Sequence, residues 1–74
     1  MNLPMLKGKL REYGKTYADL ACIINKSVTT VTAKMNGKVE FDCAEACLIS
    51  DWLNLTIEER VLIFLTKNLH GVQL

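Results

Sequence analysis

Apolar residues recur at spacings of three and four along most of the chain, which is the pattern of helices that bury one face. In the first of these segments the apolar positions are Leu3, Leu6, Leu10 and Tyr13, and in the second they are Tyr17, Leu20, Ala21 and Ile24. Three further segments begin near residues 27, 42 and 56. The pattern therefore predicts an all-α bundle of five helices.

The ends of these segments carry residues that are typical of helix ends. Thr16, Asp42 and Thr56 are each followed three residues later by Asp or Glu, as in a capping box. Gly14 follows the first segment, and Asn25 closes the second because Asn tolerates the left-handed conformation. We therefore expect helices over residues 4–13 and from residues 16, 42 and 56 onward.

Residues 27–38, SVTTVTAKMNGK, are ambiguous because β-branched residues favour strands. Strict alternation fits a strand, whereas the four-residue spacing of Val31 and Met35 fits a helix with both facing inward. Ser27 is a typical helix cap, and the pair Asn36–Gly37 is a typical helix stop. These ends favour a helix, joined to the preceding helix by a short turn.

Composition and charge narrow the class of protein. The chain has 74 residues, half of them hydrophobic, so we expect one globular domain over residues 1–74. No signal peptide or membrane-spanning run is visible, and three cysteines without a disulfide pattern fit a reduced, cytoplasmic protein. Residues 1–38 carry seven Lys and Arg against two acids, whereas residues 39–74 carry two against six. Charge alone does not decide whether the basic half faces a polyanion or is ordinary solvated surface.

The Thr-rich helix suggests contact with DNA. Thr lowers helix stability, but its short side chain offers a hydroxyl and a methyl group to base edges in the major groove. Three lysines flank this surface and can reach phosphates: Lys26, Lys34 and Lys38.

These features together resemble a known family. Residues 16–38, TYADLACIINKSVTTVTAKMNGK, are similar to the helix-turn-helix of lambda-repressor-like regulators, the Cro and phage-repressor family. The matching positions are Thr16, Leu20, Ala21, Ser27, Thr30, Val31, Asn36 and Gly37. Lys38, Phe41, Asp42 and the pair Glu58–Glu59 are similar to the short versions found in phages of Gram-positive bacteria.

The resemblance implies a five-helix DNA-binding bundle with a helix-turn-helix at about residues 16–37. Its function would be sequence-specific transcriptional regulation, with operator DNA bound by the recognition helix at residues 28–36, in the cytoplasm of a bacterial host at the nucleoid. The residues expected to face bases are Val28, Thr29, Thr32 and Ala33. Those expected at the DNA backbone are Thr16, Tyr17, Lys26, Ser27, Thr30, Lys34, Asn36 and Lys38. The base-facing set lacks Arg, Gln and Asn, so base preference is expected to be weak, thymine-rich or supplied by DNA shape.

The apolar run Val61–Leu65 is too long for one face of a short helix. We expect the core to take Val61, Leu62 and Leu65, which leaves other apolar residues for a homodimer interface. The expected interface residues lie within the segment 61–74: Ile63, Phe64, Leu69, Val72 and Leu74. The alternative is that the tail folds back over this patch within one monomer.

Other functions receive less support. A protein-binding module on the same fold, such as an antirepressor or antitoxin-like partner, is the main alternative. A zinc site would need Cys22, Cys43, Cys47 and His70, but the spacing favours free cysteines packed in the interior. The sequence has no motif for an enzyme, a cofactor, a small-molecule ligand or a membrane, so we expect none of these.

Overall fold

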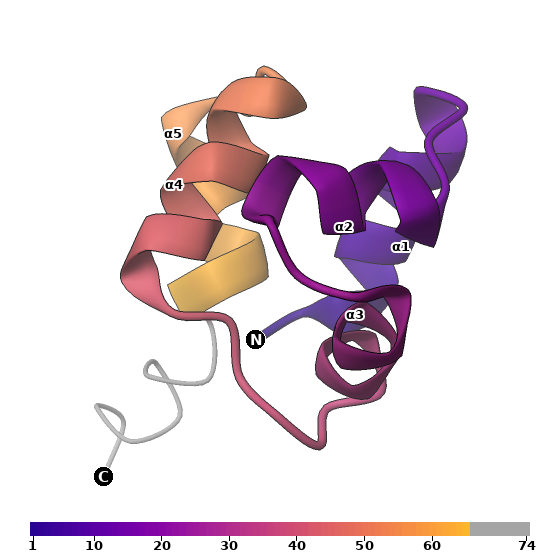
Figure 1. Cartoon of the computed structure of the whole chain (residues 1–74). Helices are drawn as coiled ribbons and strands as arrows, with labels where there is room; N and C mark the ends of the chain where they lie inside the picture. The colour runs from indigo at the N-terminus through magenta and orange to yellow at the C-terminus, as the bar shows by residue number, and fades with distance from the viewer. Residues whose placement is uncertain (66–74) are drawn as a thin grey trace, which may run out of the picture.

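The computed structural model describes residues 1–65, which form helices joined by short turns (Figure 1). The last helix continues directly into a π-helix, η1. The elements are α1 (Leu3–Glu12), α2 (Tyr17–Ile24), α3 (Val28–Met35), α4 (Cys43–Trp52), α5 (Ile57–Arg60) and η1 (Val61–Leu65). No strand occurs within this part of the chain. The all-α prediction is confirmed, and residues 28–35 form a helix rather than the strand that their β-branched residues favour.

The predicted helix starts are confirmed. Capping boxes form at Thr16, Asp42 and Thr56, where each side chain accepts a hydrogen bond from the backbone amide three residues later. Ser27 caps α3, since its Oγ accepts from the Thr30 amide at 3.1 Å. Local sequence therefore sets where these four helices begin.

Helices α1 to α4 all end in the same way. The residue that leaves each helix has a positive φ: Gly14 (66°), Asn25 (57°), Gly37 (81°) and Asn54 (52°). In each case the next amide donates to the carbonyl five residues earlier, at 2.8–3.0 Å. This is the Schellman arrangement, which Gly and Asn tolerate best. The sequence predicted three of these ends, and the fourth, at Asn54, was not predicted.

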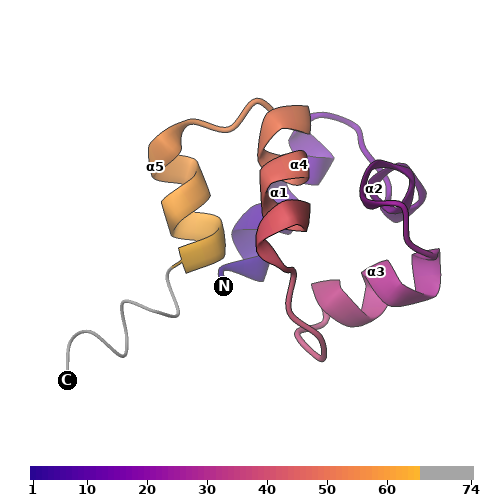
Figure 2. The same cartoon turned by 60° about the vertical axis from the view of Figure 1, so that its left-hand side comes forward.

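Helices α2 and α3 are joined by a turn at residues 25–27 and pack directly on each other. Figure 2 views α2 nearly along its axis while α3 lies across the view, so the two helices are strongly inclined. Val31 and Met35 are 0% and 1% exposed, as predicted for an inward-facing pair. Ala21 is also buried, and its small side chain suits a close approach of two helices.

The prediction for the apolar run at residues 61–65 is wrong. Ile63 and Phe64 are 0% and 8% exposed, whereas Leu62 and Leu65 are 45% and 48% exposed. The expectation assumed an α-helix, but this segment is a π-helix, whose wider turn changes which side chains face inward. Ile63 and Phe64 are therefore part of the monomer core and are not available for a dimer interface. The other three residues of the expected interface lie outside the described residues: Leu69, Val72 and Leu74.

The amino-terminal end of the chain is hydrogen-bonded to this π-helix. The Asn2 side chain caps α1 by accepting from the Met5 amide at 3.1 Å. The backbone amide of Asn2 donates to the Ile63 carbonyl at 2.6 Å. Leu6, on the next turn of α1, is fully buried in the same core as Ile63. The beginning and the end of the described chain thus close the core together.

Helix α3 lies at one edge of the molecule, and the α5–η1 segment lies at the opposite edge in both views (Figures 1 and 2). The outer side of α3 is therefore not covered by α5 or η1. Within residues 1–65 no helix has both the length and the apolar character needed to cross a bilayer.

Candidate functional site

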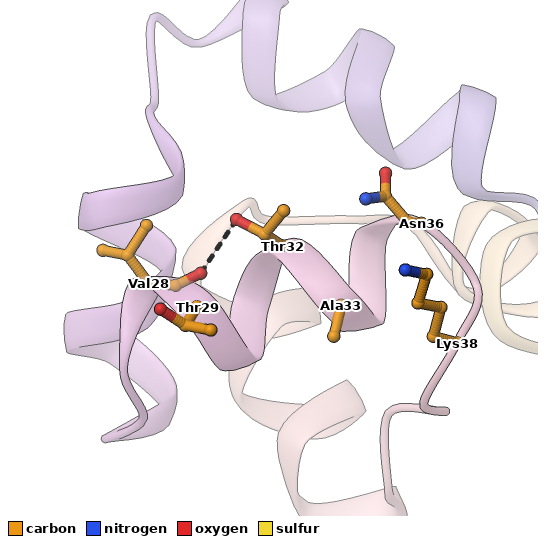
Figure 3. Close-up of a pocket in the computed structure, with 6 residues that line it drawn as sticks. All are labelled: Val28, Thr29, Thr32, Ala33, Asn36 and Lys38. Carbon is orange, nitrogen blue, oxygen red and sulfur yellow. Dashed lines mark hydrogen bonds between the residues drawn. The ribbon is translucent and has the colours of Figure 1, made fainter.

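The outer side of α3 forms one shallow groove of about 340 Å³, which we name the α3 groove (Figure 3). Its lining residues are Val28, Thr29, Thr32, Ala33, Asn36 and Lys38. The structure thus brings together all four residues expected to face bases and two of those expected at the DNA backbone.

The side chains of the α3 groove form two rows along the helix. Val28, Thr32 and Asn36 follow one edge at four-residue spacing, and Ala33 points to the other side (Figure 3). The hydroxyl of Thr32 donates to the Val28 carbonyl at 2.9 Å, so its proton is already used. The Thr29 hydroxyl makes no hydrogen bond within residues 1–65 and is free to donate or accept.

Helix α3 is short and poor in strong helix formers, so its surroundings must stabilise it. An isolated helix of eight residues is marginal in water, and Thr and Val reduce its stability further. Burial of Val31 and Met35 against α2 holds the inner side in place. Because the packed inner side fixes the helix, the outer side can carry short side chains that touch nothing else.

Hydroxyl groups gather at the starts of α2 and α3. Thr16 Oγ1 accepts from the Asp19 amide at 3.2 Å, and the Ser27 and Thr30 hydroxyl oxygens lie 3.0 Å apart in a hydrogen bond. A hydroxyl that accepts from an amide can also donate its own proton, and either Ser27 or Thr30 donates its proton in the bond between them. Lys26, beside this cluster, is exposed and forms no ion pair with any described residue.

The first turn of α2 contains one acidic residue, Asp19. Hydrogen bonds from Thr16, chiefly from its backbone amide, lower the pKa of the Asp19 carboxyl. Asp19 is therefore ionised at neutral pH, and its carboxylate is occupied by the cap. Tyr17, the first residue of α2, is half-buried.

Lys34 does not lie where the sequence analysis expected it. Only 7% of this residue is exposed, and its ammonium lies 2.9 Å from Glu45 Oε1 and 3.1 Å from the Glu40 carbonyl oxygen. Position 34 follows the buried Val31 by three residues, so it shares the inward face of α3. That spacing was a sequence signal for burial, and Lys34 is not available to contact a phosphate.

The Lys34–Glu45 pair joins α3 to α4. Glu45 Oε1 also accepts from the Asp42 backbone amide at 3.0 Å, so one oxygen serves both the ion pair and the cap of α4. Glu45 Oε2 is buried and has no hydrogen-bond partner among the described residues. The Lys34 ammonium also lies 5.6 Å from the centre of the Phe41 ring. This pair fixes the carboxyl-terminal end of α3, and with it the α3 groove, relative to the rest of the bundle.

The three cysteines are all exposed, which contradicts the expectation that they are packed in the interior. No group of three or more His, Cys, Asp or Glu residues that could hold a metal ion occurs among the first 65 residues. His70, the remaining member of the zinc set considered from sequence, lies outside the described residues.

Comparison with known proteins gives no match for this chain among protein-family models, curated proteins or solved structures. Support for a function therefore comes from the geometry of α3 and from the resemblance of residues 16–38 to the helix-turn-helix of phage regulators.

Proposed function

We propose that this protein is a sequence-specific DNA-binding transcriptional regulator of the phage Cro and repressor type, which binds operator DNA through α3. The observation that carries the proposal is the division of α3 into two sides. Val31 and Met35 anchor one side in the core, while Thr29 and its neighbours in the α3 groove lie on the exposed side. Such a helix is held rigidly while its outer face stays open to a ligand.

The exposed side suits the major groove of DNA. This groove is about 12 Å wide and admits an α-helix. Short side chains let the helix backbone approach the base edges closely. The free Thr29 hydroxyl can donate to or accept from a base, and Val28 and Ala33 can contact thymine methyl groups.

Backbone contacts would come from both ends of α3 and from the start of α2. Asn36 and Lys38 lie together at the carboxyl-terminal end of the α3 groove (Figure 3). The other expected backbone contacts are Thr16, Tyr17, Lys26, Ser27 and Thr30. Lys34 is left out because it is buried against Glu45.

Regulation would be steric, because a protein bound at an operator blocks access of the polymerase. Two copies would bind one operator, with recognition helices about 34 Å apart on successive half-sites. Leu62 and Leu65 are the exposed apolar residues of η1 and are available for contact between copies. The protein would act in the bacterial cytoplasm, at the nucleoid.

Selection from a random double-stranded DNA library at near-physiological salt tests this proposal. An enriched palindrome is the expected result, and its half-site spacing reports the geometry of the dimer. Retention of DNA without sequence enrichment would contradict sequence-specific recognition. No retention at all would contradict DNA binding altogether.

The second candidate is a protein-binding module, such as an antirepressor or antitoxin-like partner. The exposed Val28, at 47%, and the absence of Arg and Gln from the α3 groove favour this candidate. Salt distinguishes the two functions. DNA binding should weaken steeply with salt, with a log–log slope of about −0.9 for each phosphate neutralised. A protein-binding module should show little affinity for duplex DNA even at low salt.

A further inference from the structure

A second groove, separate from the lining of the α3 groove, lies between α1 and α2. Its volume is about 260 Å³, and its lining residues are Lys7, Leu10, Arg11, Lys15 and Tyr17. We name it the α1–α2 basic groove, because three of the five are cations and none is an acid. Lys7 and Arg11 are four residues apart on α1, so they project on the same side and repel each other. A ligand with negative charge would relieve this repulsion.

The cations of this groove form no ion pair with a carboxylate of residues 1–65. Other cations form ion pairs with carboxylates: Lys9 with Glu59, Lys34 with Glu45 and Arg60 with Asp51. Lys7 and Arg11 have no such partner within residues 1–65.

Lys15 also keeps its charge available. Its ammonium lies 5.4 Å from the centre of the Trp52 ring, and this aromatic partner carries no charge. Hydrogen bonds from Thr16 are the main cause that lowers the pKa of the Asp19 carboxyl and the Lys15 charge adds to it, but Lys15 and Asp19 form no ion pair among the described residues. The groove is therefore a positively charged site with three donors of charge-assisted hydrogen bonds and a phenol hydroxyl.

We propose that the α1–α2 basic groove binds a phosphate of the DNA backbone, on the same duplex that α3 reads. This inference rests on the proposed function and adds α1 to the DNA-binding surface. An Arg guanidinium beside Lys ammonium groups is well suited to phosphate oxygens. Helix α2 has eight residues and is about 12 Å long, similar to the width of the major groove. Because α2 packs directly on α3 and Tyr17 of the basic groove is the first residue of α2, we place a flanking strand of the DNA backbone at this end of α2.

The test measures the salt dependence of binding to the selected duplex, by fluorescence anisotropy at several NaCl concentrations. The triple variant Lys7→Gln/Arg11→Gln/Lys15→Gln should reduce the steepness of the log–log slope by about 0.9, as expected for one lost phosphate contact, and each single variant should reduce it by part of that amount. The ratio of affinities for the selected and a scrambled duplex should not change, because phosphates carry no base identity. Arg11→Lys keeps the charge and should retain the native slope.

A charge-matched control removes the effect of net charge. Ile57→Glu changes the net charge as Arg11→Gln does, but at a residue of α5 that is 80% exposed and far along the chain from the groove. The log–log slope of this control against salt should equal that of the native protein. Circular dichroism confirms that each variant remains helical.

Each outcome separates the two proposals. A native slope in the triple variant, with wild-type protein still binding the selected site, would overturn the α1–α2 basic groove and leave the regulator function intact. A loss of sequence preference instead of slope would also overturn it, because the residues would then act through α3. Wild-type protein that binds no duplex would overturn both.

Discussion

Charged residues serve different purposes in the two halves of this molecule. In residues 1–38 five cations have no carboxylate partner within the described chain: Lys7, Arg11, Lys15, Lys26 and Lys38. In residues 39–65 acids are bound instead to backbone amides or to cations: Asp42, Glu45, Asp51 and Glu59. Two of these acids, Glu45 and Glu59, pair with Lys34 and Lys9 of the basic half.

The comparison changes the meaning of the charge asymmetry in the sequence. The acids do not simply form a solvated face opposite a basic one, because several of them start helices and hold the first half of the chain in place. They neutralise the two lysines that pack against α4 and α5, Lys34 and Lys9. The five remaining cations have no carboxylate partner within residues 1–65 and lie in the half that contains α3. The cations that line the α3 groove and the α1–α2 basic groove all belong to these five.

Breaking the buried pair between the halves should have the largest effect. Lys34→Met leaves the Glu45 carboxylate buried without its cation, and such a loss destabilises a protein by about 3–5 kcal/mol. In a domain this small that amount can unfold most of the protein. Urea denaturation followed by Trp52 fluorescence measures the change.

The matched control for that variant is Lys34→Met combined with Glu45→Gln, which removes the charge but still lets residue 45 accept from the Asp42 amide. This double variant should recover most of the lost stability. A loss below about 1 kcal/mol for Lys34→Met alone, as for an exposed ion pair, would contradict the burial of this pair.

A negative charge on the exposed side of α3 tests whether the basic half of the molecule binds DNA. Thr29→Glu should weaken binding to the selected duplex by roughly 100-fold, which corresponds to about 2.8 kcal/mol. The cause is repulsion between the carboxylate and the DNA, so Thr29→Gln should bind more tightly than Thr29→Glu. Both variants should unfold at the same urea concentration as the native protein. If Thr29→Glu unfolds the protein, Thr29 is structural and the assigned orientation of α3 is wrong.

The contact between α2 and α3 depends on a small residue at position 21. Ala21→Leu should lower the free energy of unfolding by about 1–3 kcal/mol, because the added side chain has no space between the two helices. Ala18→Leu places the same change on the exposed side of α2 and should alter stability by no more than about 0.5 kcal/mol. Equal effects at both positions would show that helix crossing is not the cause.

The pair between Lys9 and Glu59 predicts a smaller, pH-dependent effect. The hydrogen bond from Lys9 is the main cause that lowers the pKa of Glu59, and the same bond is the main cause that raises the pKa of Lys9. The Glu59 contribution is complete above its unfolded-state pKa and is lost as pH falls through the lowered value. The Lys9 contribution is complete below its unfolded-state pKa and is lost as pH rises through the raised value.

Glu59→Gln can still cap α5, so it isolates the ion pair. This variant should be less stable than the native protein near neutral pH. The difference in stability should shrink as pH falls through the lowered pKa of Glu59 and as pH rises through the raised pKa of Lys9. Urea denaturation across a pH series measures it. A difference that stays constant with pH would show that the pair does not contribute.

The sequence predicted the parts of the fold that depend on neighbouring residues. Capping at Thr16, Asp42 and Thr56 and the turn at Asn25 involve contacts within five residues, so local patterns were sufficient. The residues of the α3 groove were expected from the resemblance of residues 16–38 to the helix-turn-helix of phage regulators, and a helical repeat with Val31 inside agrees with their exposure.

Long-range contacts explain the failures. The spacing from Val31 indicated the inward face for Lys34, but the carboxylate that neutralises it there, Glu45, lies eleven residues further along the chain. The reversed burial in η1 required knowledge of a π-helix, which α-helical periodicity does not predict. The α1–α2 basic groove combines residues of two helices and their connection, so no single segment indicated it.

The hydrogen bond between the Asn2 amide and the Ile63 carbonyl has a consequence for biosynthesis. During translation α1 leaves the ribosome before η1, and the segment that packs near Leu6 and receives the Asn2 hydrogen bond is made more than fifty residues later. The apolar side of α1 is therefore not completely covered in the nascent chain until residues 61–65 emerge. The domain acquires its complete core in a late step, and a chain released before that step would expose α1 to aggregation or proteolysis.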